Sequence, residues 1–142
     1  MLKVLVVDDE EGIRALLDIV LTRSGKFEVE LAKNGVDALT KIQAQQFDVV
    51  LTDVYMPWLD GYALCRVLRD QMGSAAPVLV IMTTSRAKAT DAGADYFLPK
   101  PFSLDAVAIV LESLARERSR IASQPVRQAE EAVAPVRRTA LA

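Results

Sequence analysis

The sequence predicts an α/β protein with a doubly wound parallel sheet of five strands, and three observations support this fold class. The chain contains several short apolar runs, rich in Val and Leu, with almost no polar alternation. Such runs are typical of strands that are buried on both faces of a parallel sheet. The segments between them carry apolar residues at helical spacing. Strand and helix signals therefore alternate along the chain, which favours right-handed β-α-β units.

Four of the apolar runs lead into residues that can do chemistry. The runs cover residues 2–7, 47–52, 78–82 and 94–98. They are followed in turn by Asp8-Asp9, Asp53, Thr83-Thr84 and Pro99-Lys100-Pro101. Parallel strands place their carboxyl ends at one edge of the sheet, where open α/β sheets bind their ligands. We therefore expect three acids, a hydroxyl and a lysine to meet at that edge.

Four helices are predicted from apolar spacing and from their end signals, such as Asn34 as a cap and Ser24-Gly25 as a stop. They cover about residues 10–24, 35–45 and 61–71, and a last helix that begins after Ser103. Their apolar faces are expected to point inward, with Ile13, Leu16, Leu17, Val20 and Leu21; Val36, Leu39 and Ile42; Leu64, Val67 and Leu68; and Leu104, Val107, Leu111 and Leu114.

The segment between the last two strands leaves little room for a helix. Only residues 85–92 are available before the Gly93-Ala94-Asp95 turn, and they show little apolar stripe. Two helical turns at most fit there, so we expect a shortened or irregular fourth helix.

The chain is expected to form one domain and a tail. Residues 1–118 hold all the strand and helix signals. Residues 119–142 are expected to extend the last helix briefly, until Gln124-Pro125 ends it, and then to form a disordered tail without aromatic residues. The first residues lack the pattern of a signal peptide, and no apolar run approaches the roughly 18 residues of a membrane span. A cytoplasmic location, without membrane attachment, is the expectation.

Composition excludes several kinds of function. The net charge is −2, so nothing indicates direct nucleic-acid binding. The 142 residues include no histidine, which excludes Ser-His-Asp and Cys-His triads, imidazole-bound zinc and a phosphohistidine carrier. Cys65 is the only cysteine, so no internal disulfide can form. The chemistry must therefore use carboxylates, an amine, hydroxyls and the backbone.

These groups suit a phosphoryl site with a magnesium ion. Asp8 and Asp9 supply hard oxygen ligands for the metal. Asp53 is placed to be both a metal ligand and a nucleophile, because aspartates can form acyl phosphates. Lys100 would pair with phosphate oxygens as a compact cation, and the Thr83 hydroxyl would donate to another.

In these residues the chain resembles the receiver domain of two-component response regulators, over residues 2–116. Asp8-Asp9 resembles the acidic pair of that family and Asp53 its phosphoacceptor. The other matching pieces are Met56-Pro57, Asp60-Gly61, the switch hydroxyl of Thr83 and the motif Lys100-Pro101-Phe102.

The resemblance, which is to chemotaxis-type single-domain receivers, implies the fold and the reaction. It implies a flavodoxin-like strand order 2-1-3-4-5 with five flanking helices. It also implies that a sensor histidine kinase or a phosphotransfer protein donates phosphate to Asp53 in the presence of Mg²⁺. The Tyr55 backbone carbonyl would complete the coordination shell of this ion. The chain would then catalyse only its own phosphotransfer and dephosphorylation, and would signal to a protein partner that the sequence does not identify.

The same resemblance implies a switch and exposes a departure. Phosphate on Asp53 would draw Thr83 inward, and the aromatic ring of Phe97 would follow. Lys100 comes 17 positions after Thr83, which is shorter than the family pattern. The missing residues fall in the fourth helix, so we do not expect the dimerisation that family members make through that helix.

Three other functions stay open on the sequence alone. A degenerate receiver would act by protein contact without phosphorylation. An aspartyl-phosphate phosphatase of the haloacid dehalogenase type wants an Asp-x-Asp motif, whereas Asp8 and Asp9 are adjacent. A nucleotide-binding module would need a glycine-rich phosphate loop, and neither common form occurs.

Two aromatic residues near Asp53 have two readings each. The Tyr55 ring either shields an acyl phosphate from water or points to solvent. Trp58 either contacts a partner or packs over the third helix.

Overall fold

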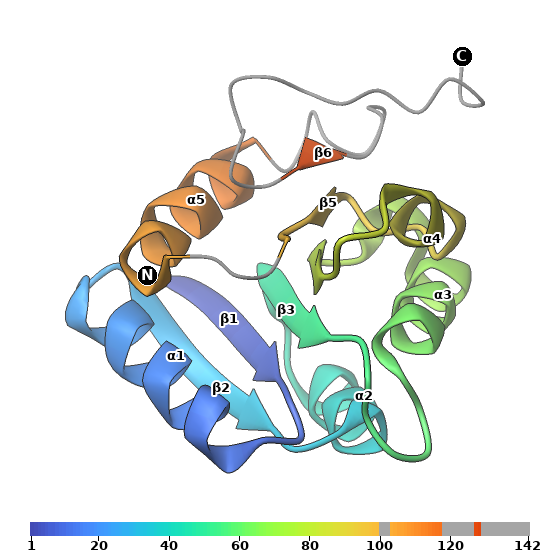
Figure 1. Ribbon diagram of the computed structural model, residues 1–142, viewed down its shortest axis with the longest axis horizontal. Coiled ribbons are helices and arrows are strands. Elements are labelled where there is room, and N and C mark those ends of the chain that lie inside the picture. Colours follow the sequence, from blue (N-terminus) through green and yellow to red (C-terminus); the bar gives the residue numbers. More distant parts are fainter. Residues whose placement is uncertain (100–102, 118–126, 129–142) are drawn as a thin grey trace.

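The computed structural model describes residues 1–99, 103–117 and 127–128, and these form alternating strands and helices around one sheet (Figure 1). The strands are β1 Leu2–Val7, β2 Phe27–Ala32, β3 Val49–Asp53, β4 Val78–Met82, β5 Tyr96–Phe97 and β6 Arg127–Gln128. The α-helices are α1 Glu11–Arg23, α2 Gly35–Ala44, α3 Gly61–Met72, α4 Arg86–Asp91 and α5 Leu104–Arg116, and a single 3₁₀ turn, η1, covers Gly73–Ala75.

The sheet is parallel throughout, with the order β2-β1-β3-β4-β5-β6. The first five strands confirm the predicted order 2-1-3-4-5. The chain starts in the middle of the sheet, moves to one edge with β2, and returns past β1 to build the other side. This reversal beside β1 creates the crevice at which doubly wound sheets bind ligands.

A sixth short strand corrects the expectation of a tail without structure. Arg127 and Gln128 pair in parallel with Tyr96 and Phe97. Because β5 would otherwise present a free edge, its backbone groups can pair with another extended segment. No strand pattern marks Arg127 and Gln128, since two residues are too few for a pattern. The rest of the predicted tail lies outside the described residues.

Helices cover both faces of the sheet and enclose two separate cores (Figure 1). Along β1, alternate residues point to opposite faces. Val4 and Val6 pack under α1 and α5, whereas Leu5 and Val7 pack under α2, α3 and α4. This explains the unalternating strand sequences, because both faces of each central strand are buried.

Two apolar residues expected to face the core are exposed instead. Leu16 in α1 is 47% exposed and Val36 in α2 is 51% exposed. Leu17 and Leu21 carry the contact of α1 and are fully buried. Each helix presents a narrower stripe to the sheet than its apolar residues suggest, so the residue at the border of the stripe faces solvent.

Helix α4 is as short as predicted, with six residues. Arg69 of α3 fixes the turn that follows α4. Arg69 donates from Nε to the Gly93 carbonyl at 3.0 Å, and from a terminal nitrogen to Asp95 at 3.0 Å. Asp95 in turn accepts from the Leu79 N–H of β4 at 2.9 Å. Among the helices that the structure describes, none combines the length and apolarity that a membrane crossing requires.

Candidate functional site

The candidate site lies at the carboxyl ends of the two central strands, β1 and β3. These strands pair so that Val7 lies beside Thr52, which brings their following residues to the same edge. Asp8 is fully buried and Asp53 is 6% exposed, while Asp9 is exposed. Because carboxylates are rarely buried without a purpose, two buried aspartates at a ligand-binding edge indicate a functional site.

The loop after β1 is held in one shape by hydrogen bonds to Asp8. Its Oδ1 accepts from the Glu10 N–H at 2.9 Å, and its backbone carbonyl accepts from the Arg14 guanidinium at 2.6 Å. Its own N–H donates to the Ala32 carbonyl of β2 at 3.1 Å. The strand end, the loop and the first turn of α1 are therefore tied together around one carboxylate.

Three carboxylates of this loop form a group suited to a cation. Oxygen atoms of Asp8, Asp9 and Glu10 all lie within 4.8 Å of one another. Carboxylate oxygens are the ligands that Mg²⁺ prefers, so this donor set fits the predicted ion. Asp8 and Asp9 were predicted to hold it, whereas Glu10 was not. The signal for Glu10 was its place directly after the acidic pair, which reads equally well as a helix start.

Asp53 does not belong to that group at this spacing among the described residues. Its position is set by the backbone around it. Its carbonyl accepts from the Thr52 hydroxyl at 2.9 Å, and the Gly61 N–H donates to the neighbouring Val54 carbonyl at 2.8 Å. A Cβ atom at Gly61 would collide with the Asp53 carbonyl oxygen. The start of α3 therefore presses directly on the backbone of the predicted phosphoacceptor.

Thr83 follows β4 and is half-buried beside the same edge. Its Oγ1 lies 2.6 Å from the Tyr62 hydroxyl of α3 and accepts from the Ser85 N–H at 3.2 Å. Phe97 is 6% exposed and packs in the core beneath α3 and α4. The ring proposed to switch is thus already buried. Tyr62 was not singled out as a partner of Thr83, because no pattern links positions 21 residues apart.

The aromatic residues of the loop after β3 point to solvent. Tyr55 is 80% exposed, which favours the second of its two readings over a shield for an acyl phosphate. Trp58 is 83% exposed and has a φ of 69°, so its ring does not pack over α3. The metal role predicted for the Tyr55 carbonyl concerns its backbone only. Lys100, the predicted cation, lies outside the described residues.

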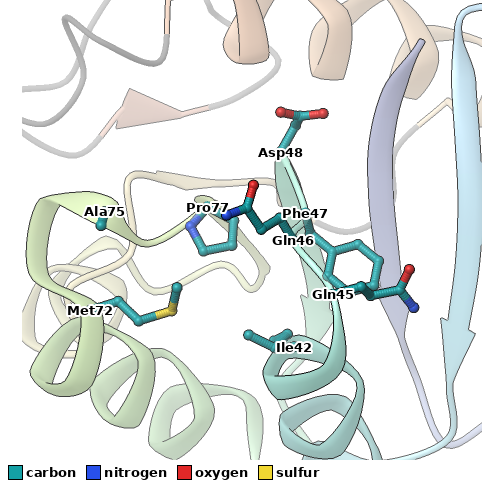
Figure 2. Close-up of a pocket in the computed structure, with 8 residues that line it drawn as sticks. All are labelled: Ile42, Gln45, Gln46, Phe47, Asp48, Met72, Ala75 and Pro77. Atoms are coloured by element: carbon teal, nitrogen blue, oxygen red, sulfur yellow. The ribbon is translucent and has the colours of Figure 1, made fainter.

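A pocket elsewhere on the molecule is distant from these carboxylates. It has a volume of about 370 Å³ and lies at the amino ends of β3 and β4, at the opposite edge of the sheet (Figure 2). Its lining consists of Ile42, Gln45, Gln46, Phe47, Asp48, Met72, Ala75 and Pro77. The Asp48 carboxylate accepts from the Lys3 N–H at 2.8 Å and so joins two strands. We therefore assign the chemistry to the carboxyl edge.

Comparison with known proteins gives one consistent family. A sequence model of the response regulator receiver domain matches residues 4–112. Response regulator MprA of Mycobacterium sp. strain KMS is 41% identical over 121 residues, covering 82% of this chain and 52% of that protein. MprA of Mycobacterium tuberculosis is 41% identical over 118 residues, covering 80% of this chain and 50% of that protein. The chain thus spans about half the length of these curated relatives.

Solved structures agree with the sequence relatives. The receiver domain of the Francisella response regulator 1452 superimposes with a TM-score of 0.74 and 30% identity. That match covers 82% of this chain and 98% of the other. Chemotaxis response regulator CheY4 of Vibrio cholerae gives a TM-score of 0.73 with 33% identity, covering 80% of this chain and 98% of the other.

Proposed function

Because the chain belongs to the response regulator receiver domain family, we propose that it accepts a phosphoryl group on Asp53 and signals by a conformational change to a protein partner. The observation that carries this proposal is the near-complete burial of Asp53 at the strand end beside Asp8. A carboxylate in this place can attack phosphorus and form an acyl phosphate. Its backbone is fixed from both sides, which favours a defined line of attack.

The acidic loop is suited to hold Mg²⁺ next to this carboxylate. We assign the metal to Asp8, Asp9, Asp53 and the Tyr55 backbone carbonyl, with Glu10 close enough to contribute. The ion would neutralise charge on the phosphoryl oxygens. Asp8 fixes the loop through its bonds to Glu10 and Arg14, so the ligand oxygens are arranged before any ion binds.

Two further groups are proposed to contact the phosphoryl oxygens. The Thr83 hydroxyl stands at the end of β4 as a neutral donor. Lys100 would supply the positive charge, and this role rests on the resemblance of Lys100-Pro101-Phe102 to the family motif. Phe97 is proposed to respond to Thr83, because its ring lies in the core against which Tyr62 packs, and the Tyr62 hydroxyl contacts Thr83.

The phosphoryl donor is proposed to lie outside these 142 residues. They include no histidine, so we propose that a sensor histidine kinase or a phosphotransfer protein supplies the phosphohistidine. We propose that this exchange takes place in the cytoplasm. We propose no enzymatic activity beyond phosphotransfer to Asp53 and its hydrolysis, no direct nucleic-acid binding and no membrane attachment. The downstream partner is a protein of unassigned identity.

A small phosphodonor with Mg²⁺ tests this proposal. Incubation should add one phosphoryl mass to the wild-type chain, and peptide mapping should place it on Asp53. Asp53→Asn should stay unmodified, while Asp70→Asn, at an exposed position of α3, should behave as wild type. Equal modification of the Asp53→Asn variant would reject the assignment. An unmodified wild type that still changes conformation with a partner would favour a degenerate receiver.

A further inference from the structure

Tyr62 brings a phenol into contact with the hydroxyl that the phosphoryl site is proposed to use. It is the second residue of α3, and its half-buried ring packs against the core that contains Phe97. Its hydroxyl lies 2.6 Å from Thr83 Oγ1, a distance typical of a strong hydroxyl–hydroxyl bond. The same helix presses on the Asp53 backbone through Gly61. Tyr62 is therefore held by the element that also positions the phosphoacceptor.

The bonding capacity of Thr83 decides what this contact does. A threonine hydroxyl has one proton to donate and two lone pairs that accept. The Ser85 N–H already occupies one lone pair, at 3.2 Å. A phenol is a more acidic hydroxyl than that of threonine and is the better donor of the two. When Tyr62 donates into the second lone pair, the Thr83 proton is left for a third partner.

We propose that Tyr62 is a positioning residue for phosphoryl binding, which donates to Thr83 Oγ1 and thereby directs the Thr83 proton toward a phosphoryl oxygen on Asp53. This inference rests on the proposed function, because it requires a phosphoryl group at Asp53. Hydrogen bonds in a chain polarise one another, so a Thr83 hydroxyl that accepts from Tyr62 is a stronger donor to the phosphoryl group. Tyr62 acts through Thr83 and makes no contact with the phosphoryl group itself.

The same oxygen connects the site with the shortened helix. The Ser85 N–H donates to Thr83, and Ser85 Oγ accepts from the Lys88 N–H at 3.2 Å as the cap of α4. Thr83 Oγ1 therefore joins the start of α3 to the start of α4. Tyr62 thus prepares Thr83 for its ligand in advance.

Beryllofluoride with Mg²⁺, a mimic of the phosphoryl group, provides the test on the full chain. The only tryptophan, Trp58, lies five residues after Asp53, and its fluorescence is followed as beryllofluoride is added. Calorimetry gives a second measure of Kd. We expect Tyr62→Phe, which keeps the ring and loses the hydroxyl, to raise Kd on the order of two- to tenfold, the range of one neutral hydrogen bond. In a Thr83→Ala background the same change should alter Kd no further.

The test has a control variant and outcomes that would overturn the role of Tyr62. Thr40→Ala removes a hydroxyl that donates to the Val36 carbonyl within α2, and it should keep the wild-type Kd. Equal or tighter binding by Tyr62→Phe overturns the proposal, since tighter binding means that Tyr62 competes with the phosphoryl group for Thr83. A loss of equal size in both Thr83 backgrounds also overturns it, because Tyr62 then acts independently of Thr83. A loss of stability common to both backgrounds cancels in this comparison.

The outcome for the wild type separates this inference from the proposed function. If the wild-type chain binds no beryllofluoride and is not modified at Asp53 by a small phosphodonor, both proposals fail. If the wild type binds and is modified while Tyr62→Phe matches it, only the role of Tyr62 fails.

Discussion

Gly61 shows how one missing side chain can set the geometry of a reactive carboxylate. The residue starts α3, and its Cα faces the Asp53 carbonyl so closely that a Cβ atom has no room. Its N–H holds the Val54 carbonyl at 2.8 Å. The glycine is required here for close approach, so substitution must move the strand end, the helix or both.

Gly61→Ala should therefore impair phosphorylation as well as stability. Displacing backbone in a packed region costs about 1–3 kcal/mol, and the Asp53 carboxylate moves with its carbonyl. Denaturant unfolding measures the first effect and the rate of modification by a small phosphodonor measures the second. Gly12→Ala is the matched control, because Gly12 lies within α1 and a Cβ there meets nothing within 4 Å. That variant should gain about 0.5–1 kcal/mol of stability and keep its rate. Equal rates in both variants would contradict the steric argument.

Cys65 should be an unreactive thiol in the folded protein. It is fully buried in the core beneath α3, and this burial raises the pKa of the thiol from 9.0 to about 12. Thiolates, not thiols, attack disulfide reagents. At pH 8 we expect labelling by such a reagent to be slow in the native state and fast in denaturant. Rapid stoichiometric labelling without denaturant would show that the core opens easily. Cys65→Ala gives the background, since the chain has no other cysteine.

The same pKa shift makes the contribution of Cys65 to stability depend on pH. The folded pKa is raised above the unfolded value, so the contribution is fully present below about pH 9 and is lost as the pH rises toward 12. The difference in unfolding free energy between wild type and Cys65→Ala should therefore shrink over this interval. A constant difference would show that the folded thiol ionises as easily as the unfolded one.

Among the elements, the short helix α4 depends on a clamp from its neighbour α3. Arg69 spans the turn after α4 and contacts Gly93 and Asp95, with side chains of Arg69 and Asp95 that are 28% and 12% exposed. It also donates to the Gly73 carbonyl at 2.9 Å. Gly93 has a φ of +81°, and a Cβ atom there would approach the Arg69 side chain at 3.1 Å. A side chain at position 93 would therefore be strained and would crowd Arg69.

Arg69→Met should loosen α4 and β5 together. The change keeps much of the apolar stem but removes three donors, one of which binds the Asp95 carboxylate. Hydrogen bonds to charged groups contribute about 1.5–3 kcal/mol each, so a loss of about 2–3 kcal/mol is expected. Denaturant unfolding measures it, and hydrogen exchange should rise locally in residues 86–97. Arg66→Met, at an exposed position of α3, is the control. Equal stability of the two variants would contradict the proposal that the contacts of Arg69 stabilise α4 and β5.

The contacts of Arg69 also illustrate which features could not be predicted from the sequence. Strands β1, β3, β4 and β5 and helices α1, α2, α3 and α5 could be predicted, because their apolar spacing and caps are local signals. The Asn34 cap, for instance, accepts from the Asp37 N–H at 2.7 Å as expected. The contacts of Arg69 and Tyr62 could not be predicted, since their partners lie 21 to 26 residues away. Only the fold brings those pairs together.

At the scale of the whole molecule, the position of the site follows from the parallel pairing of β1 and β3 in the sheet. Asp8 and Asp53 could be placed together from sequence, because both follow strands with buried faces and such strands align their carboxyl ends. Glu10 could not be separated from a helix start by pattern alone. The exposed positions of Tyr55 and Trp58 also depended on the three-dimensional course of the loop after β3. The sheet thus concentrates acidic groups at one edge, with their position fixed by two cores behind it.

Magnesium should stabilise this whole arrangement. Three carboxylates within 4.8 Å of one another repel, and a divalent cation that binds the folded chain converts that repulsion into attraction. A ligand at ten times its Kd adds about 1.4 kcal/mol to the free energy of unfolding when it binds only the folded state. For a domain of this size that corresponds to several degrees in Tm.

Thermal unfolding with MgCl₂ should show this rise, and a chelator should reverse it. NaCl at equal ionic strength should give less, because screening alone does not bridge the carboxylates. Asp9→Asn removes one exposed member of the group without disturbing the core, and it should weaken the response. An undiminished rise in that variant would place the stabilising cation elsewhere on the molecule.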